Sequence, residues 1–326
     1  MVAIRNTSPS WIKSLILMAL SLVLVTACHQ SRPPQQDVLP EGKNSIEACR
    51  TVQHALGEVC IPLNPQRIVI LDEFYLLDNL TALGIKPVGY TPCLLCTSSD
   101  VLSKYIADVP ALGDINTPSL EKIVSLKPDF ILGLEWQEKF YPLLSKIAPT
   151  VMIGNLELNS LRENLEYLAE ILDRDSHQIE EILVTYNEKV EEFRQQFSEK
   201  LKSKSVSVIG IHETSFYAYE LGFRIYDQVM TDVGIQFSDA QKSVEGYGYR
   251  TLSIESLPDW DADFLFVLQN YERHAEDLAS MMEHPIWSTL NVVQNEKVHP
   301  IVLDVWGPIT AIHFIDDLYQ YFSEAL

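Results

Sequence analysis

The strongest constraint on the fold is a pattern that this chain repeats. The stretch "SLEKIVSLKPDFILGLEW" (119–136) is echoed by "SIESLPDWDADFLFVLQ" (253–269). Each copy runs from Ser through a short, partly apolar segment containing Glu to a breaker, then to Asp-Phe and an apolar run. This order predicts a short helix followed by a buried strand, built once in each of two similar lobes. The aligned pairs, 134 residues apart, are Glu121 with Glu255, Asp129 with Asp263, and Phe130 with Phe264.

Short apolar strands alternate with helices along most of the chain, which predicts an α/β fold with a mainly parallel sheet. In the first half we expect strands at 67–72, 85–90, 129–134 and 150–153, helices near 73–83 and 137–147, and a long loop at 91–117. In the second half we expect strands at 206–211, 216–221, 263–268 and 298–303, and helices through 228–230, within 283–290 and at 309–326.

A long amphipathic segment separates the two halves. Apolar residues recur at spacings of three and four from Ile179 to Phe197, with no Gly or Pro between them. This periodicity predicts a helix of about 25 residues that joins two α/β lobes. A coiled-coil arm is the alternative, although the repeat is short for one. The expected division is a signal peptide at 1–27, a tether at 28–45, an N-terminal lobe at 46–175, a connecting helix at 176–202 and a C-terminal lobe at 203–326, with a ligand cleft between the lobes.

The start of the chain has the features of an export signal. Arg5 and Lys13 precede an apolar run from Leu15 to Val25, which is too short for a membrane span of about 20 residues. The following "LVTAC" resembles the lipobox of bacterial lipoproteins, which implies cleavage before Cys28 and its acylation. An ordinary signal peptide with a chance cysteine is the alternative. With the Pro- and Gln-rich tether, this predicts an extracytoplasmic protein anchored by lipid to the cell membrane, on the periplasmic side in a Gram-negative cell.

Charge and cysteine content agree with export. The formal net charge is −21, which disfavours a nucleic-acid partner. Cys49 and Cys60 flank a predicted hairpin turn, so we expect a disulfide that joins them across the hairpin. For Cys93 and Cys96, in "CLLC", we favour a disulfide that closes a loop. Free thiols and a metal or redox role are the alternatives.

Taken in order, the segments from "CRTVQHALGEVCIPLNPQRIVILD" to "HPIWSTLNVVQNEKVHPIVLDVWGPITAIHFIDDL" resemble a known family. They are similar to the iron-siderophore binding proteins of bacterial ABC importers, a cluster that also includes vitamin B12 and haem binders. The resemblance implies two α/β lobes joined by one long helix, with a ferric chelate held between them. It also implies a monomer that docks on a membrane permease, has no catalytic residues and needs no cofactor, because iron arrives as a chelate.

The resemblance gives the repeated carboxylates a role. In the family, one surface Glu on each lobe forms salt bridges with Arg residues of the two permease subunits. Glu121 and Glu255 match that motif position in the two copies. The alternative is that both are ordinary solvated carboxylates, since exposed ion pairs contribute only about 0–1 kcal/mol each.

The expected ligand contacts are aromatic and basic residues near the carboxyl ends of strands, where open α/β sheets bind ligands. Six of the fourteen Tyr lie between 217 and 271, and two Trp follow predicted strands. Aromatic faces suit a chelate of several hundred daltons, and Arg can neutralise its oxygens. Core packing is the alternative for each aromatic. The expected residues are Trp136, Tyr217, Arg224, Tyr247, Tyr249, Arg250, Tyr271 and Trp306.

Other chemistries leave little trace in the sequence. The eight His are scattered without a His-x-His or His-Glu-x-x-His pair, so no metal site is expected. No nucleophile elbow and no phosphate loop occur in the sequence. The alternative from another class is therefore an exported hydrolase of an unusual type. Within the binding class, a haem or corrinoid carrier is the alternative. The acidic composition favours a neutral or cationic hydroxamate chelate over a strongly anionic catecholate.

Overall fold

The computed structural model describes residues 49–96, 100–154, 160–222, 224–245, 248–270 and 273–326. Glu47–Leu326 form one compact unit. The expected signal peptide and tether, Cys28, Tyr247 and Tyr271 lie outside the described residues. In the part that is described, none of the helices combines the length and the apolar character that a membrane span needs.

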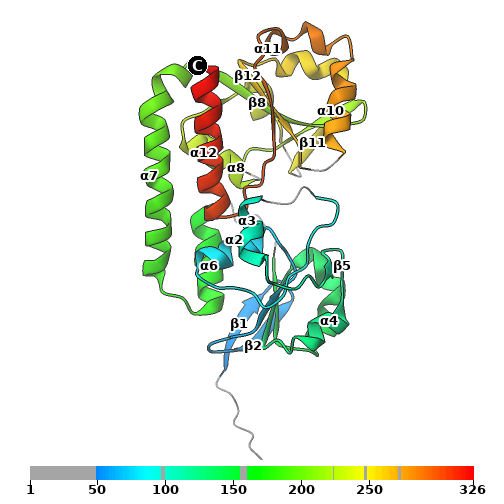
Figure 1. The fold of residues 1–326 in the computed structure, drawn as a ribbon, viewed down its shortest axis with the longest axis vertical. Coiled ribbons are helices and arrows are strands. Elements are labelled where there is room, and N and C mark those ends of the chain that lie inside the picture. Colours follow the sequence, from blue (N-terminus) through cyan, green and yellow to red (C-terminus); the bar gives the residue numbers. More distant parts are fainter. Residues whose placement is uncertain (1–48, 97–99, 155–159, 223, 246–247, 271–272) are drawn as a thin grey trace, which may run out of the picture. The chain divides into compact units, whose positions relative to one another are not determined.

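The N-terminal lobe is built on a parallel sheet of three described strands in the order β3-β6-β7 (Figure 1). All residues of these strands are buried, as their continuous apolar sequences predict for a parallel sheet covered on both faces. The strands are β3 (Ile68–Ile70), β6 (Phe130–Leu134) and β7 (Thr150–Ile153). Around them lie α2 (Tyr75–Ala82), α3 (Asp100–Ile106), α4 (Leu120–Ser125), η1 (Glu135–Phe140), α5 (Tyr141–Leu144), α6 (Leu161–Leu172), the β1–β2 hairpin (Cys49–His54, Gly57–Pro62), and the short pair β4 (Gly113–Asp114) and β5 (Thr117–Pro118).

The C-terminal lobe carries a mixed sheet of six described strands. Its path is β11-β9-β8-β12-β13, and β10 pairs with β8. The centre is parallel, whereas β8-β9-β11 is antiparallel. The strands are β8 (Ser205–His212), β9 (Ser215–Tyr219), β10 (Gln236–Phe237), β11 (Tyr249–Ser253), β12 (Phe264–Leu268) and β13 (Val298–Ile301). Its helices are α8 (Ile225–Asp232), α9 (Asp239–Lys242), η2 (Ile254–Trp260), α10 (His274–Met282), η3 (Trp287–Thr289), α11 (Asn291–Gln294) and α12 (Pro308–Ala325).

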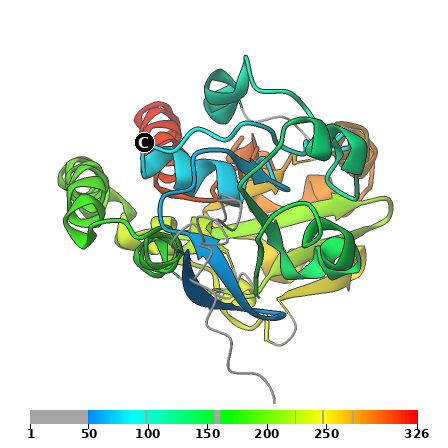
Figure 2. The same ribbon diagram turned by 90° about the horizontal axis from the view of Figure 1, so that it is seen from below.

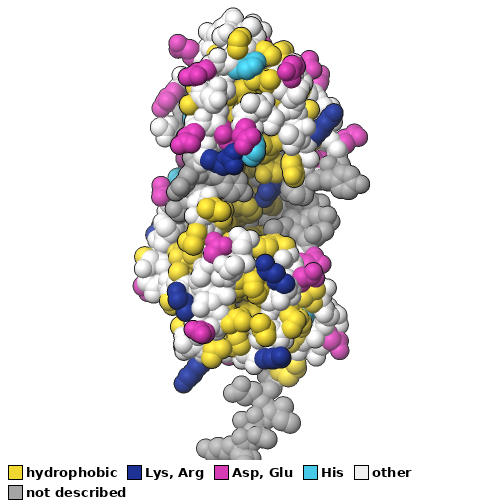
Figure 3. Space-filling view, turned by 90° about the vertical axis from the view of Figure 1, so that its right-hand side faces the viewer, with side chains coloured by type: hydrophobic (Ala, Val, Ile, Leu, Met, Phe, Trp, Pro, Cys, Tyr) yellow, Lys and Arg dark blue, Asp and Glu magenta, His cyan; other side chains and the backbone are white. Residues whose placement is uncertain are grey.

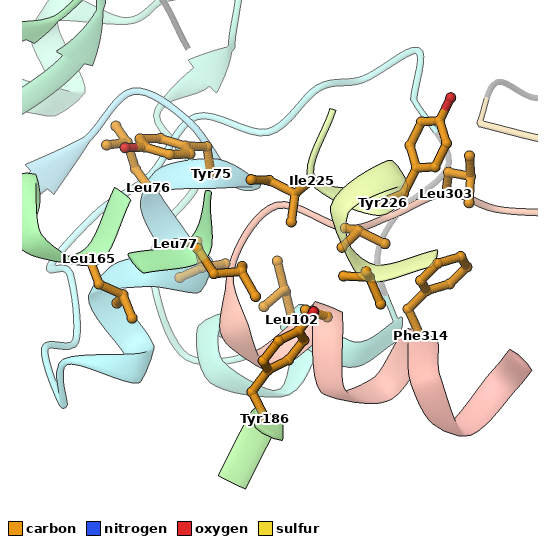
Figure 4. Close-up of a cluster of buried hydrophobic side chains, with 14 of the residues drawn as sticks. Tyr75, Leu76, Leu77, Leu102, Leu165, Tyr186, Ile225, Tyr226, Leu303 and Phe314 are labelled. Atoms are coloured by element: carbon orange, nitrogen blue, oxygen red, sulfur yellow. The ribbon is translucent and has the colours of Figure 1, made fainter. Parts of the chain in front are cut away.

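The long helix α7 (Ser176–Leu201) lies where the sequence predicts one and packs along α12 (Figure 1, Figure 2). Its N-cap is Asp175, whose carboxylate accepts the His177 N–H. Its buried side chains recur at the predicted spacing from Ile179 to Leu201. They join one apolar core that draws on both lobes. Figure 4 shows part of this core, with Leu77 of α2, Ile225 of α8 and Phe314 of α12 gathered together.

A buried carboxylate of the N-terminal lobe caps helix α12 of the C-terminal lobe. Asp78 of α2 accepts the backbone N–H groups of Ile309 (2.9 Å) and Thr310 (3.0 Å), and the Thr310 hydroxyl donates to it as well. These N–H groups lack partners within the helix, so Asp78 does the work of an N-cap from another element. The approach is close, because a Cβ at Gly307 would lie 2.7 Å from the Asp78 carboxyl carbon.

The repeated Asp has the same structural role in both lobes. Asp129 accepts the backbone N–H groups of Gln66 (2.7 Å) and Arg67 (2.8 Å), just before β3. Asp263 accepts the N–H of Ser205 (2.9 Å) at the start of β8. Each Asp precedes one parallel strand and fixes the beginning of its neighbour. The repeat of Asp at 129 and 263 therefore has a structural cause, because each Asp helps to assemble the sheet of its lobe.

Several sequence predictions differ from the structure. The segment 85–90 lies beside β3 but forms only isolated bridges, between Gly89 and Val69 of β3 and between Tyr90 and Ala111. The expected loop at 91–117 contains α3 and the small β4–β5 pair. The expected helix at 137–147 is instead η1 followed by one turn of α5. The second repeat has a 3-10 helix in place of an α-helix, since Pro258 lies inside it.

We predict that Asp78→Ala lowers the free energy of unfolding by about 2–4 kcal/mol, because it leaves buried N–H groups of α12 without an acceptor. Chemical denaturation followed by circular dichroism measures this. Asp239→Ala, which removes an exposed carboxylate from the first turn of α9, is the matched control and should change stability by less than about 0.5 kcal/mol. Equal effects of the two substitutions would show that the cap does not hold α12.

Candidate functional site

A cavity opens where strands of both lobes end. Phe74 follows β3, Asn270 follows β12, and Asp304 follows β13. This is the edge of an open parallel sheet at which α/β proteins bind ligands. The cavity encloses about 630 Å³ of empty space, its open mouth included. The described residues that line it are Phe74, Cys96, Tyr217, Tyr219, Arg224, Tyr226, Leu268, Asn270, Leu303, Asp304 and Trp306.

The wall of the cavity contains a layered stack of side chains from both lobes. The Trp306 ring stacks on Phe74, with centroids 5.3 Å apart and planes 28° apart. On the C-terminal side, the guanidinium of Arg224 lies 5.3 Å from the Trp306 ring centroid and 4.7 Å from that of Tyr219. Its Nη2 also donates to the Tyr219 hydroxyl (3.4 Å). Arginine held against aromatic faces keeps its charge and its outward donors in a fixed plane.

The tyrosines of β9 and β11 form a cluster beside this stack. Tyr217 and Tyr219 point to the same face of β9, and the ring of Tyr249 lies 6.3 Å from each. Gly210 makes room for Tyr217, since a Cβ there would lie 2.0 Å from the Tyr217 ring. The cluster therefore depends on a strand position that has no side chain.

Tyr226 brings a buried hydroxyl to the cavity. It lies in the first turn of α8 and is 3% exposed. Figure 4 shows its hydroxyl pointing away from the apolar core. No group in the described part of the chain hydrogen-bonds with this oxygen. Burial raises the pKa of Tyr226 well above its ordinary value, so the phenol is neutral and able to donate.

Carboxylates surround the base of the stack. Asp304 accepts the Trp306 indole N–H (2.7 Å). Asp72 accepts the N–H groups of Phe74 (3.0 Å) and Leu76 (2.8 Å) at the turn into α2, and Glu73 accepts that of Cys93 (2.5 Å). Burial, together with nearby negative charge from Asp304, raises the pKa of Asp72 to about 6 and that of Glu73 to about 7.

The structure brings three of the predicted ligand residues into the cavity wall: Tyr217, Arg224 and Trp306. Tyr249 is 56% exposed and touches the cluster through its ring. Arg250 pairs with Ala218 across β9–β11, so its side chain projects from the face of the sheet opposite to the one that carries Tyr217 and Tyr219. Trp136 lies in η1, 49% exposed, and does not line the cavity.

Eight residues of the cavity wall are not among the predicted ligand residues: Phe74, Cys96, Tyr219, Tyr226, Leu268, Asn270, Leu303 and Asp304. Tyr219 and Tyr226 carried a signal, since both lie in the tyrosine-rich segment. Phe74, Asn270 and Asp304 carried a weaker one, because each follows a predicted strand, where ligand residues of α/β proteins gather.

The repeated glutamates lie on the surface. Glu121 is in the first turn of α4, and Glu255 is in the first turn of η2; both are exposed. Neither lines the cavity. The two carboxylates are therefore available to a partner.

Two disulfides join the four cysteines of the compact unit. The expected Cys49–Cys60 bond is confirmed, but the hairpin register pairs Cys60 with Thr51, so the bond runs diagonally and not directly across. Cys93 and Cys96 are joined as well, and Cys96 reaches the cavity wall. Within the described ranges no cluster of His, Cys, Asp and Glu has the arrangement of a metal site.

We predict that Glu73→Gln changes the pH dependence of stability. The pKa of Glu73 is raised in the folded protein, so folding favours its protonated form and the ionised form is costly. The stability of the wild type relative to Glu73→Gln should rise as pH falls through about 7 and level off near the ordinary value of 4.5. Urea unfolding at several pH values between 8 and 4 measures this.

Glu138→Gln, which changes an exposed carboxylate of η1, is the control and should give no such trend between pH 8 and 5. A difference between wild type and Glu73→Gln that does not vary with pH would contradict the assignment.

Comparisons with known proteins agree on one family. The family model described as "Periplasmic binding protein" matches residues 82–301. The probable siderophore-binding lipoprotein YfiY of Bacillus subtilis (strain 168) is 29% identical, over 95% of this chain and 98% of its own length. The achromobactin-binding periplasmic protein of Dickeya dadantii (strain 3937) is 28% identical, over 78% of this chain and 85% of its own. The crystal structure of Staphylococcus aureus SirA complexed with staphyloferrin B matches with a TM-score of 0.68 and 25% identity, over 84% of this chain and 98% of that one.

Proposed function

This chain belongs to the periplasmic binding protein family, and we propose that it is the extracytoplasmic substrate-binding protein of an ABC importer. It captures a ferric siderophore and delivers it to the membrane permease. The observation that carries the proposal is the stack of Phe74, Trp306, Arg224 and Tyr219 at the edge where parallel strands of both lobes end. Relatives named for siderophore and achromobactin binding support the same class of ligand.

The chemistry of the cavity suits a ferric chelate. Such a ligand is large, rigid and rich in oxygen, with apolar linkers between its iron-binding groups. Trp306 and Tyr219 offer aromatic faces, while Arg224, Tyr226 and Asn270 offer hydrogen-bond donors for chelate oxygens. Because iron enters already coordinated, the protein needs no metal ligands of its own. We infer that it binds its ligand without turning it over and carries no cofactor.

We predict that Trp306→Ala raises the Kd for a ferric siderophore at least about tenfold, because it removes the central layer of the stack. Isothermal calorimetry with ferric hydroxamate, carboxylate and catecholate chelates measures this and does not rely on Trp fluorescence. Trp136→Ala is the matched control, since Trp136 lies outside the cavity wall, and it should change the Kd less than twofold. If the wild type binds none of these chelates, the proposed function is wrong. A haem or cobalamin absorption band in the purified protein would point to the carriers of those ligands.

We also propose that Glu121 and Glu255 dock the loaded protein on the permease. Two exposed carboxylates, one on each lobe, are suited to pairing with Arg on two permease subunits and to fixing orientation. The lobe that bears α4 also presents hydrophobic side chains, which spread over the lower part of the face seen in Figure 3. Val124 of α4, 53% exposed, is among the exposed hydrophobic residues.

We predict that Glu121→Arg and Glu255→Arg each reduce iron uptake and leave the chelate Kd unchanged. Like charges brought together at an interface cost several kcal/mol, so uptake by the double variant should fall to about a tenth or less. Growth on the chelate as sole iron source, together with calorimetry, separates docking from binding. Glu163→Arg, which reverses an exposed carboxylate of α6, is the control and should be neutral. Normal uptake by the double variant would rule out this docking mode.

The remaining parts fit the same proposal. Acylation of Cys28 and the tether at 28–45 would hold the protein at the membrane surface, on the periplasmic side in a Gram-negative cell. The lobes at 46–175 and 203–326, joined by the helix at 176–202, would act as a monomer on the permease. The formal net charge of −21 argues against a nucleic-acid partner.

A further inference from the structure

The cavity is poor in positive charge. Among the described residues that line it, Arg224 is the only cation. The undescribed segments within the compact unit (47–48, 97–99, 155–159, 223, 246–247 and 271–272) contain no Lys or Arg in their sequence. Arg250 leaves the opposite face of the sheet, and Arg273 lies near the carboxylates of Glu213 (3.5 Å) and Asp277 (3.4 Å).

Negative charge is abundant around the same cavity. Asp304 lines it and holds the indole N–H of Trp306. Asp72 and Glu73 precede Phe74, and Asp78 lies behind Gly307, the residue after Trp306. Repulsion from Asp304 contributes to the raised pKa of all three of these carboxyls, so the group is close enough to act together.

Arg224 is placed to orient a ligand, and a single guanidinium is a weak match for a highly charged one. Its guanidinium lies against the rings of Tyr219 and Trp306, and its Nη2 donates to the Tyr219 hydroxyl. Asp227, which accepts the Arg224 backbone N–H (3.3 Å), adds a further carboxylate nearby. A chelate with several negative charges would meet one cation and a surrounding group of acids.

We propose, on the basis of the proposed function, that this cavity selects ferric chelates of little or no net charge and discriminates against strongly anionic ones. Three hydroxamates balance the charge of ferric iron, so a ferric trishydroxamate is uncharged. Three catecholates leave the complex trianionic. The favoured ligand class is therefore a hydroxamate-type chelate, which is recognised through aromatic contact and directed hydrogen bonds.

The test compares two probes of equal denticity, a hexadentate ferric trishydroxamate and a hexadentate ferric triscatecholate, by calorimetry with the mature protein at low salt. The measurement is made at pH 8, above the raised pKa values of about 6 for Asp72 and about 7 for Glu73, so that these carboxyls are ionised. We expect the uncharged probe to bind at least about tenfold more tightly. Added salt should narrow this preference, because it screens repulsion.

Charge-neutral variants test the cause of the preference. Asp304→Asn keeps an acceptor for the Trp306 N–H, and it should shift the ratio of the two Kd values several-fold in favour of the triscatecholate. Glu73→Gln provides a second variant if Asp304→Asn does not fold. Asp316→Asn, which changes an exposed carboxylate paired with Lys189, is the control and should leave the preference unaltered.

The outcomes are separable. Equal or tighter binding of the triscatecholate by the wild type would overturn the charge selection and leave the proposed function standing. Failure of the variants to shift the preference would also overturn it. Binding of neither probe would overturn this inference, whereas the proposed function would be refuted only if ferric carboxylate chelates also failed to bind.

Discussion

The contact between Asp78 and the first turn of α12 ties the two lobes to the cavity. Asp78 comes from the N-terminal lobe, yet it satisfies backbone donors of the last helix of the chain. Thr310 extends the connection, since its hydroxyl donates to Asp78 and accepts the backbone N–H of Trp306 (2.9 Å). Asn79 adds a bond to the Trp306 carbonyl (3.2 Å). The backbone of the central aromatic residue of the cavity is thus held from the opposite lobe.

The repeated unit combines two kinds of carboxylate with different roles. Asp129 and Asp263 accept backbone N–H groups at the start of a neighbouring strand, so each is needed to assemble its sheet. Glu121 and Glu255 are exposed, in the first turn of a short helix. Two exposed carboxylates at the same place in each lobe would match a partner made of two similar subunits, which is what the proposed docking requires.

The sequence predicts those parts of the molecule whose signal is local. The fully buried strands β6 and β12 and the helix α7 follow from apolar runs and periodicity, and the cavity follows from the rule about strand ends. The prediction that Arg250 contacts the ligand shows where local signals fail. Which face of β11 Arg250 occupies depends on the register of that strand, and the register is set by pairing with β9. Phe74 and Asp304 come from different lobes, so they line one cavity only because the two lobes pack together. The 3-10 geometry of η2 arises where an internal Pro competes with a helical pattern.

The same packing that fixes the cavity also affects how it can bind. One apolar core runs through α2, α7, α8 and α12, so a large closure of the lobes would have to break buried contacts as well as the Asp78 cap. Recognition therefore has to come from side chains that are already in place. Trp306 is held between Phe74 and Arg224, and Arg224 between Trp306 and Tyr219. Side chains ordered in this way lose little entropy on binding, which lets a cavity with one guanidinium hold a rigid ligand through shape and directed donors.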